Sequence, residues 1–290
     1  MSEDVAFRTL AAGVGFTEGP VWTLSGELLV TSMSRGLVYQ VDVAEGDGPS
    51  PTVASYETGG GPNGLAEGPG GRVFVAQNGG ATAPSRSTRP VTPSIQVIDH
   101  GQVQDLLVTG LTAPNDLVVG PDRRVWFTDP DGGSPRTVGG RVLAFDPATG
   151  DVDVLLVDVD FPNGLAFGPG GDVLYVADTT ADEIVRYRVV DGMPVDRSVF
   201  AHVPGTGPDG IALDADGNLY IAAFASDEVV VVDPSGAVAR RLSTGPRSRP
   251  TNLCFAGENL DMLVVTLASG GRVVALTEPV PGQRALPWAQ

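Results

Sequence analysis

The sequence has a single cysteine, Cys254, and only two histidines, His100 and His202. One cysteine excludes an intramolecular disulfide and any cysteine-rich zinc centre. Its apolar surroundings, LCFAG, predict a place in the core. So few histidines argue against a Ser-His-Asp triad and against a histidine-based zinc site. We expect His100 in a hairpin turn and His202 in a loop.

Long apolar runs and basic side chains are scarce as well. No run approaches the roughly 20 apolar residues that span a bilayer, and helical periodicity is absent. The chain has 18 Lys and Arg against 35 Asp and Glu, a net charge of −17, which repels nucleic-acid phosphates and anionic membranes. We therefore expect no nucleic-acid or membrane partner. The start, MSEDVAFRTLAAG, lacks a secretory pattern, so a cytoplasmic location is expected.

What the chain does contain is an internal repeat. Each copy has a polar residue, a short apolar stretch, a turn rich in Gly, Pro and Asp, and then an alternating apolar stretch. Two such stretches joined by a tight turn predict a β-hairpin. Equivalent polar residues lie 42 to 52 positions apart, and they are Glu18, Asn63, Asn115, Asn163, Asp209 and Thr251.

This period predicts the architecture, because a four-stranded propeller blade takes about 40 to 50 residues. We predict an all-β fold, a six-bladed β-propeller with four-stranded antiparallel blades, as a single domain over residues 1–290. Near-equal copies favour a closed ring over a solenoid. Residues 5–12 are expected to add an outer strand to the last blade and so close the ring. The stretch 79–94, rich in Pro, Ser and Thr, is expected to be an inserted loop.

The six equivalent polar residues form the candidate site. Innermost strands line a propeller's channel, so these residues should converge on one axis. Asn or Asp before Gly is a common turn pair, and the simplest interpretation gives these residues no chemistry. That interpretation does not account for Glu18, nor for Asp116 where other copies have glycine. Buried carboxylates and amides need a compensating cation, and oxygen donors favour calcium or magnesium, with manganese as an alternative.

The strings FTEGPVW, PNDLVV, FPNGLAF, PDGIALDADGNLYIA and PTNLCF, in this order, resemble the SMP-30, gluconolactonase and luciferin-regenerating family of propellers. The resemblance covers nearly the full length. It implies one divalent cation, with calcium foremost and magnesium, manganese or zinc as alternatives. The matching ligand positions are Glu18, Asn163 and Asp209, and Asn115 completes or flanks the site.

The resemblance also implies the hydrolysis of a small lactone or ester. The cation would polarise the carbonyl group and activate water, and Asp209 would act as general base or as nucleophile. Asn115 and Asn63 are the expected substrate contacts. Sugar lactonases of the family often have an arginine two residues before the position of Asn115, where this chain has Ala113. Arg136, in the glycine-rich loop that follows, is the candidate substitute.

Two other functions stay open on the sequence alone. The same site would suit the hydrolysis of phosphotriesters or fluorophosphates. Alternatively, the propeller is a non-catalytic scaffold whose ring holds a structural ion. Carboxylates at only two of the six ring positions favour an active site over a structural plug. We expect a monomer or a weak homo-oligomer.

Overall fold

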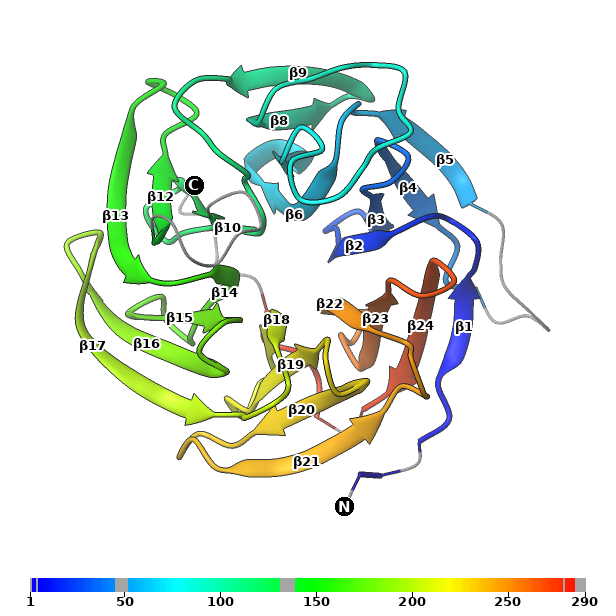
Figure 1. Ribbon diagram of the computed structural model, residues 1–290, viewed down its shortest axis with the longest axis vertical. Coiled ribbons are helices and arrows are strands. Elements are labelled where there is room, and N and C mark those ends of the chain that lie inside the picture. Colours follow the sequence, from blue (N-terminus) through cyan, green and yellow to red (C-terminus); the bar gives the residue numbers. More distant parts are fainter. Residues whose placement is uncertain (1, 4, 45–51, 131–138, 279, 285–290) are drawn as a thin grey trace.

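The computed structural model describes residues 2–3, 5–44, 52–130, 139–278 and 280–284. Within these ranges the chain forms 24 strands in six four-stranded antiparallel sheets. Figure 1 shows the sheets arranged as blades around a central axis, which confirms the predicted six-bladed propeller. The one helical element described is a 3-10 turn, Pro69–Gly71. No helix in the described ranges is long and apolar enough to cross a membrane.

Each repeat of the sequence builds one blade, counted outward from the axis. The first blade consists of β2 (Thr17–Trp22), β3 (Leu28–Ser32), β4 (Leu37–Val41) and β5 (Thr52–Glu57). The second consists of β6 (Pro62–Gly68), β7 (Arg72–Gln77), β8 (Ser94–Asp99) and β9 (Gln102–Leu107). The third consists of β10 (Leu117–Val119), β11 (Val125–Asp129), β12 (Gly140–Phe145) and β13 (Val152–Val159).

The remaining blades follow the same order. The fourth consists of β14 (Pro162–Phe167), β15 (Val173–Asp178), β16 (Glu183–Val190) and β17 (Met193–His202). The fifth consists of β18 (Pro208–Leu213), β19 (Leu219–Ala223), β20 (Glu228–Val232) and β21 (Val238–Ser243). The sixth consists of β22 (Pro250–Ala256), β23 (Met262–Leu267), β24 (Arg272–Thr277) and, outermost, β1 (Arg8–Ala11).

The two ends of the chain close the ring in the last blade. Strand β1 pairs antiparallel with β24, with Arg8 opposite Ala275 and Thr9 opposite Val274. This confirms the closure predicted for residues 5–12. The innermost strands β2, β6, β10, β14, β18 and β22 contact one another in turn around the axis, and β22 returns to β2. The third and sixth blades therefore face each other across the channel.

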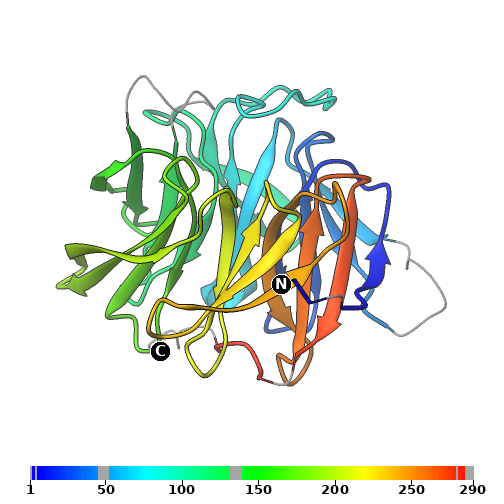
Figure 2. The same cartoon turned by 60° about the horizontal axis from the view of Figure 1, so that its bottom comes forward.

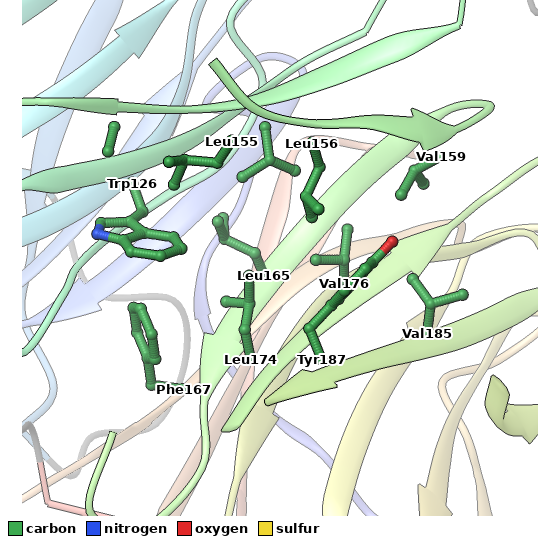
Figure 3. Close-up of a cluster of buried hydrophobic side chains, with 12 residues drawn as sticks. Trp126, Leu155, Leu156, Val159, Leu165, Phe167, Leu174, Val176, Val185 and Tyr187 are labelled. Carbon is green, nitrogen blue, oxygen red and sulfur yellow. The ribbon is translucent and has the colours of Figure 1, made fainter. Parts of the chain in front are cut away.

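The hydrophobic core lies between the blades. Six buried clusters fill the six interfaces, so each blade packs its two faces against two neighbours. Figure 3 shows the cluster between the third and fourth blades, where Trp126 meets Phe167 edge to face with ring centroids 5.1 Å apart. Because every strand is covered on both sides, the core extends around the whole disc that Figure 2 shows tilted.

Two smaller predictions can be placed. His100 lies in the turn between β8 and β9 with a φ of 46°, as predicted. The prediction that His202 lies in a loop is wrong, because it ends β17 and its Nε2 lies 3.3 Å from Oε1 of Glu183. The predicted loop at 79–94 follows β7, and it packs on the first blade through a hydrogen bond from Arg86 N to Ser34 O of 2.8 Å.

Candidate functional site

The structure brings the six predicted polar residues to the same end of the innermost strands. Five are members of these strands, and Asn115 precedes β10, which is the shortest of them. All six side chains are buried, and they are Glu18, Asn63, Asn115, Asn163, Asp209 and Thr251. Thr251 uses its hydroxyl internally, because Oγ1 bonds to Thr17 O at 2.8 Å and lies 2.8 Å from Thr266 Oγ1.

Threonines on the second strands fix the backbone of this ring. Thr31 Oγ1 donates to Asn63 O at 2.8 Å, and Thr128 Oγ1 donates to Asn163 O at 2.9 Å. Each bond joins one blade to the ring residue of the next blade. Sequence reasoning missed these residues, although a signal was present: both threonines stand where other repeats have alanine in the strings VAQ, VAD and IAA.

Three carboxylates lie in the channel, one more than the ring predicted, and they come from alternate blades. Burial raises the pKa of Glu18 to about 8, and the nearby charge of Asp116 adds to the rise. Burial likewise raises the pKa of Asp116 to about 6. The pKa of Asp209 lies well above its usual range, first because of burial and then because of Glu18 and Asp116. No basic side chain contributes to any of these shifts.

Asp116 and Asn252 bridge the channel from opposite blades. Asn252 Nδ2 donates to Asp116 Oδ2 at 3.2 Å, and each side chain also accepts a hydrogen bond from the next backbone N–H of its own strand. They occupy the position after the ring residue, where the other four blades have glycine. A Cβ on Gly64 would collide with Asp116, and one on Gly210 would collide with Asn252. The glycines thus leave room for the bridge.

The amides supply neutral oxygen donors beside the carboxylates. Asn163 Nδ2 donates to Thr179 Oγ1 at 3.1 Å, which leaves its Oδ1 free to accept. The side-chain oxygen of Asn63 is fully buried and has no hydrogen-bond partner among the described residues. A buried acceptor without a partner is costly, and it marks a place where a cation, a water or a substrate hydroxyl completes the bonding.

The chemistry of these donors fits a hard divalent cation. Within the described ranges no three Asp, Glu, His or Cys side chains come close enough to form a metal site by themselves. Ligation here therefore needs amide oxygens together with carboxylates, as the sequence predicted. Buried acids without a basic neighbour and the unpartnered oxygen of Asn63 are both compensated by a cation. Oxygen donors without sulfur or imidazole suit calcium or magnesium.

The predicted substrate arginine cannot be placed, because Arg136 lies outside the described residues. Ala113 is fully buried, and its N–H donates to Asp129 Oδ1 at 2.7 Å. Asp129 is in turn paired with Arg141. The position of the family arginine is therefore closed over by the fold itself.

A cavity of about 780 Å³ lies at the opposite end of the channel. Asp116 and Asn252 line it, whereas none of the six ring residues does. Apolar side chains from the far halves of the innermost strands form most of its wall, among them Leu117, Phe167 and Leu213. Its size alone would make it the default binding site. The groups that perform chemistry, however, lie on the other side of the bridge.

The comparisons with known proteins agree with this geometry. A family model described as the SMP-30/gluconolactonase/LRE-like region matches residues 16–269. The chain belongs to this family. A gluconolactonase of Zymomonas mobilis is 26% identical over 285 residues, covering 89% of this chain and 78% of the relative. The adipocyte plasma membrane-associated protein of Gallus gallus is 30% identical over 219 residues, covering 68% of this chain.

The match spans only 51% of the adipocyte protein, so the chain corresponds to about half of that relative. Among solved structures, regucalcin from Agrobacterium tumefaciens, described as a calcium-binding protein, has a TM-score of 0.81. The two chains are 20% identical and cover 100% and 99% of each other. At this identity the likeness shows the fold that they share.

Proposed function

We propose that this member of the SMP-30/gluconolactonase/LRE-like family is a lactonase that depends on a divalent cation bound in the polar ring. The observation that carries the proposal is the set of three buried carboxylates and adjacent amides without a basic neighbour. Relatives named gluconolactonase support the lactone substrate, since they match along most of the chain. The calcium-binding regucalcin supports calcium as the cation.

Glu18, Asn163, Asp209 and Asn115 would hold the cation. When bound, the cation would polarise the lactone carbonyl and lower the pKa of a coordinated water. Glu18 balances its charge from the first blade, and Asn163 is already oriented by its bond to Thr179. Asp116, held by Asn252, adds negative charge beneath the site. Asn63, whose side-chain oxygen is unpartnered among the described residues, and Asn115 are placed to contact the substrate.

Asp209 accepts the proton in the proposed reaction. Water oxygen bonds to the carbonyl carbon as its proton passes to Asp209, the ring C–O bond breaks, and the proton reaches the departing alkoxide to give a hydroxy acid. The burial that raises the pKa of Asp209 makes its ionised form a stronger base. Direct attack by Asp209 is the alternative. Oxygen-18 entering the protein during a single turnover in labelled water would identify it.

A hydrolysis panel tests the proposal. The purified protein is assayed with sugar lactones, aliphatic lactones, an aryl ester, a phosphotriester and a fluorophosphate, before and after chelation and with calcium restored. We expect lactones to be the best substrates and activity to be lost and regained with the cation. Preferential fluorophosphate hydrolysis would favour the phosphorus chemistry, and no hydrolysis of any compound would favour the scaffold.

A further inference from the structure

Two loops that lead into neighbouring innermost strands share one backbone conformation. The first, residues 203–208, which we call the glycine loop, enters β18. The carboxylate of Asp182 clamps it by accepting hydrogen bonds of 2.8 Å from the N–H groups of Gly205 and Gly207. Both glycines have left-handed backbone, with φ of 73° and 53°.

The second loop, residues 244–249, which we call the arginine loop, enters β22 with the same clamp. Asp227 accepts hydrogen bonds from Arg247 N at 2.6 Å and from Arg249 N at 2.9 Å. Both arginines are left-handed, with φ of 57° and 54°. Side chains other than glycine rarely adopt this region, and the glycine loop forms the same turn without them. The fold therefore does not require arginine here, and strained backbone of this kind points to a function.

The two arginines differ in where their side chains start. A Cβ on Gly205 would meet nothing within 4 Å, whereas one on Gly207 would lie 3.4 Å from Ala225 Cβ. The shared backbone carries this difference to the arginine loop, so Arg247 starts toward open space and Arg249 starts against the wall. The Arg249 guanidinium indeed lies 5.6 Å from the ring centroid of Phe224.

Phe224 places this guanidinium at the polar end of the channel. It follows Ala223, whose strand partner Pro208 immediately precedes Asp209. Arg249 itself lies two residues before Thr251 of the ring. In the described part of the chain the guanidinium forms no side-chain hydrogen bond or ion pair. Stacked on an aromatic face, it keeps its N–H edges for a planar or tetrahedral anion.

We propose that Arg249, stacked on Phe224, binds an anionic substituent of the substrate, a carboxylate, phosphate or sulfonate on the lactone. This rests on the proposed lactonase function of the ring. Arg249 is the arginine of the slot two residues before the ring, the slot that holds Ala113 in the third blade. On a chain with a net charge of −17, a guanidinium at the mouth gives an anionic ligand a local attraction that the rest of the surface lacks.

The test compares Arg249→Gly with Arg247→Gly, which removes the same charge from the same loop and the same backbone region. Each protein is assayed on a six-membered sugar lactone with and without a phosphate on its exocyclic carbon. Titration calorimetry with the phosphorylated open-chain sugar acid measures binding without turnover. Melting temperature is recorded for all variants.

We expect Arg249→Gly to lose about 10- to 100-fold in kcat/KM on the phosphorylated lactone and in affinity for the phosphorylated acid, with the neutral lactone unaffected. Its melting temperature should match or exceed that of the parent. Arg247→Gly should change binding less than about threefold. Equal losses on both lactones, equal effects of the two variants, or a lower melting temperature for Arg249→Gly would overturn the proposal. If the parent opens no lactone, the lactonase proposal fails, and calorimetry alone decides the role of Arg249.

Discussion

The two ends of the channel are built from the same six strands and differ completely in chemistry. At one end lie buried carboxylates and amides, and at the other a cavity of about 780 Å³ with a largely apolar wall. The bridge between Asp116 and Asn252 separates them. Side chains alternate along a strand, and each repeat places a polar residue where its strand begins and apolar residues further along. Charge placement, more than cavity size, distinguishes the reactive end.

The largest expected effect is at the polar end. Asp209→Asn keeps the shape of the side chain and removes the proton acceptor and the negative charge. We expect a loss of lactone hydrolysis on the order of 10²- to 10⁴-fold, with a melting temperature at or above that of the parent when the cation is absent. Steady-state kinetics and thermal unfolding measure both. A variant with more than a tenth of the parent's kcat would show that Asp209 is not the base.

The next effect is a pH dependence of stability in the chelated protein. The unfolded chain releases the Glu18 proton near its usual pKa of 4.5, whereas the folded chain holds it until about pH 8. The folded state therefore binds more protons between these values, and stability falls as pH rises through this window. We expect a drop on the order of 5 °C in melting temperature.

Glu18→Gln is the control, because glutamine resembles the protonated acid. It should remove part of the slope, and saturating calcium should flatten the slope in the parent protein. A melting temperature of the chelated parent that is flat or rises over this window would contradict the burial of uncompensated carboxylates.

A moderate effect is expected at the bridge itself. Asn252→Ala removes the donor to Asp116 and leaves that carboxylate buried with one bond fewer. We expect a loss of about 1 to 3 kcal/mol in the free energy of unfolding by urea. Asn259→Ala, an exposed amide in the adjoining turn, is the matched control and should change stability by less than about 0.5 kcal/mol. Similar losses in both would remove the bridge from the account.

The smallest effect is expected at the apolar end. Ala212 lines the cavity, and Ala212→Leu adds apolar volume there without touching the ring. We expect kcat/KM within about twofold of the parent, and a stability change below about 1.5 kcal/mol. A tenfold loss of activity would mean that the substrate uses the cavity, and the contrast between the two ends would need revision.

Much of this could be read from the sequence, and the reasons are specific. The repeat that begins at Glu18 and recurs at Asn63 determines the blades, and strand β1 closes the ring as predicted. Asp116 was visible as a departure from glycine, but its bond to Asn252, 136 residues away, depends on the two blades facing each other. The left-handed backbone of Arg249 was invisible, because only the comparison of two folded loops shows it.

The central claim is that the polar end of the channel holds one divalent cation. Calorimetric titration of the chelated protein with calcium tests it most directly, with the parent compared with the double variant Glu18→Gln, Asp209→Asn. The account predicts one ion per chain for the parent and no measurable binding to the double variant, with both proteins folded by circular dichroism. A parent that binds no calcium, magnesium or manganese, or a double variant that binds the ion as well as the parent, would contradict it.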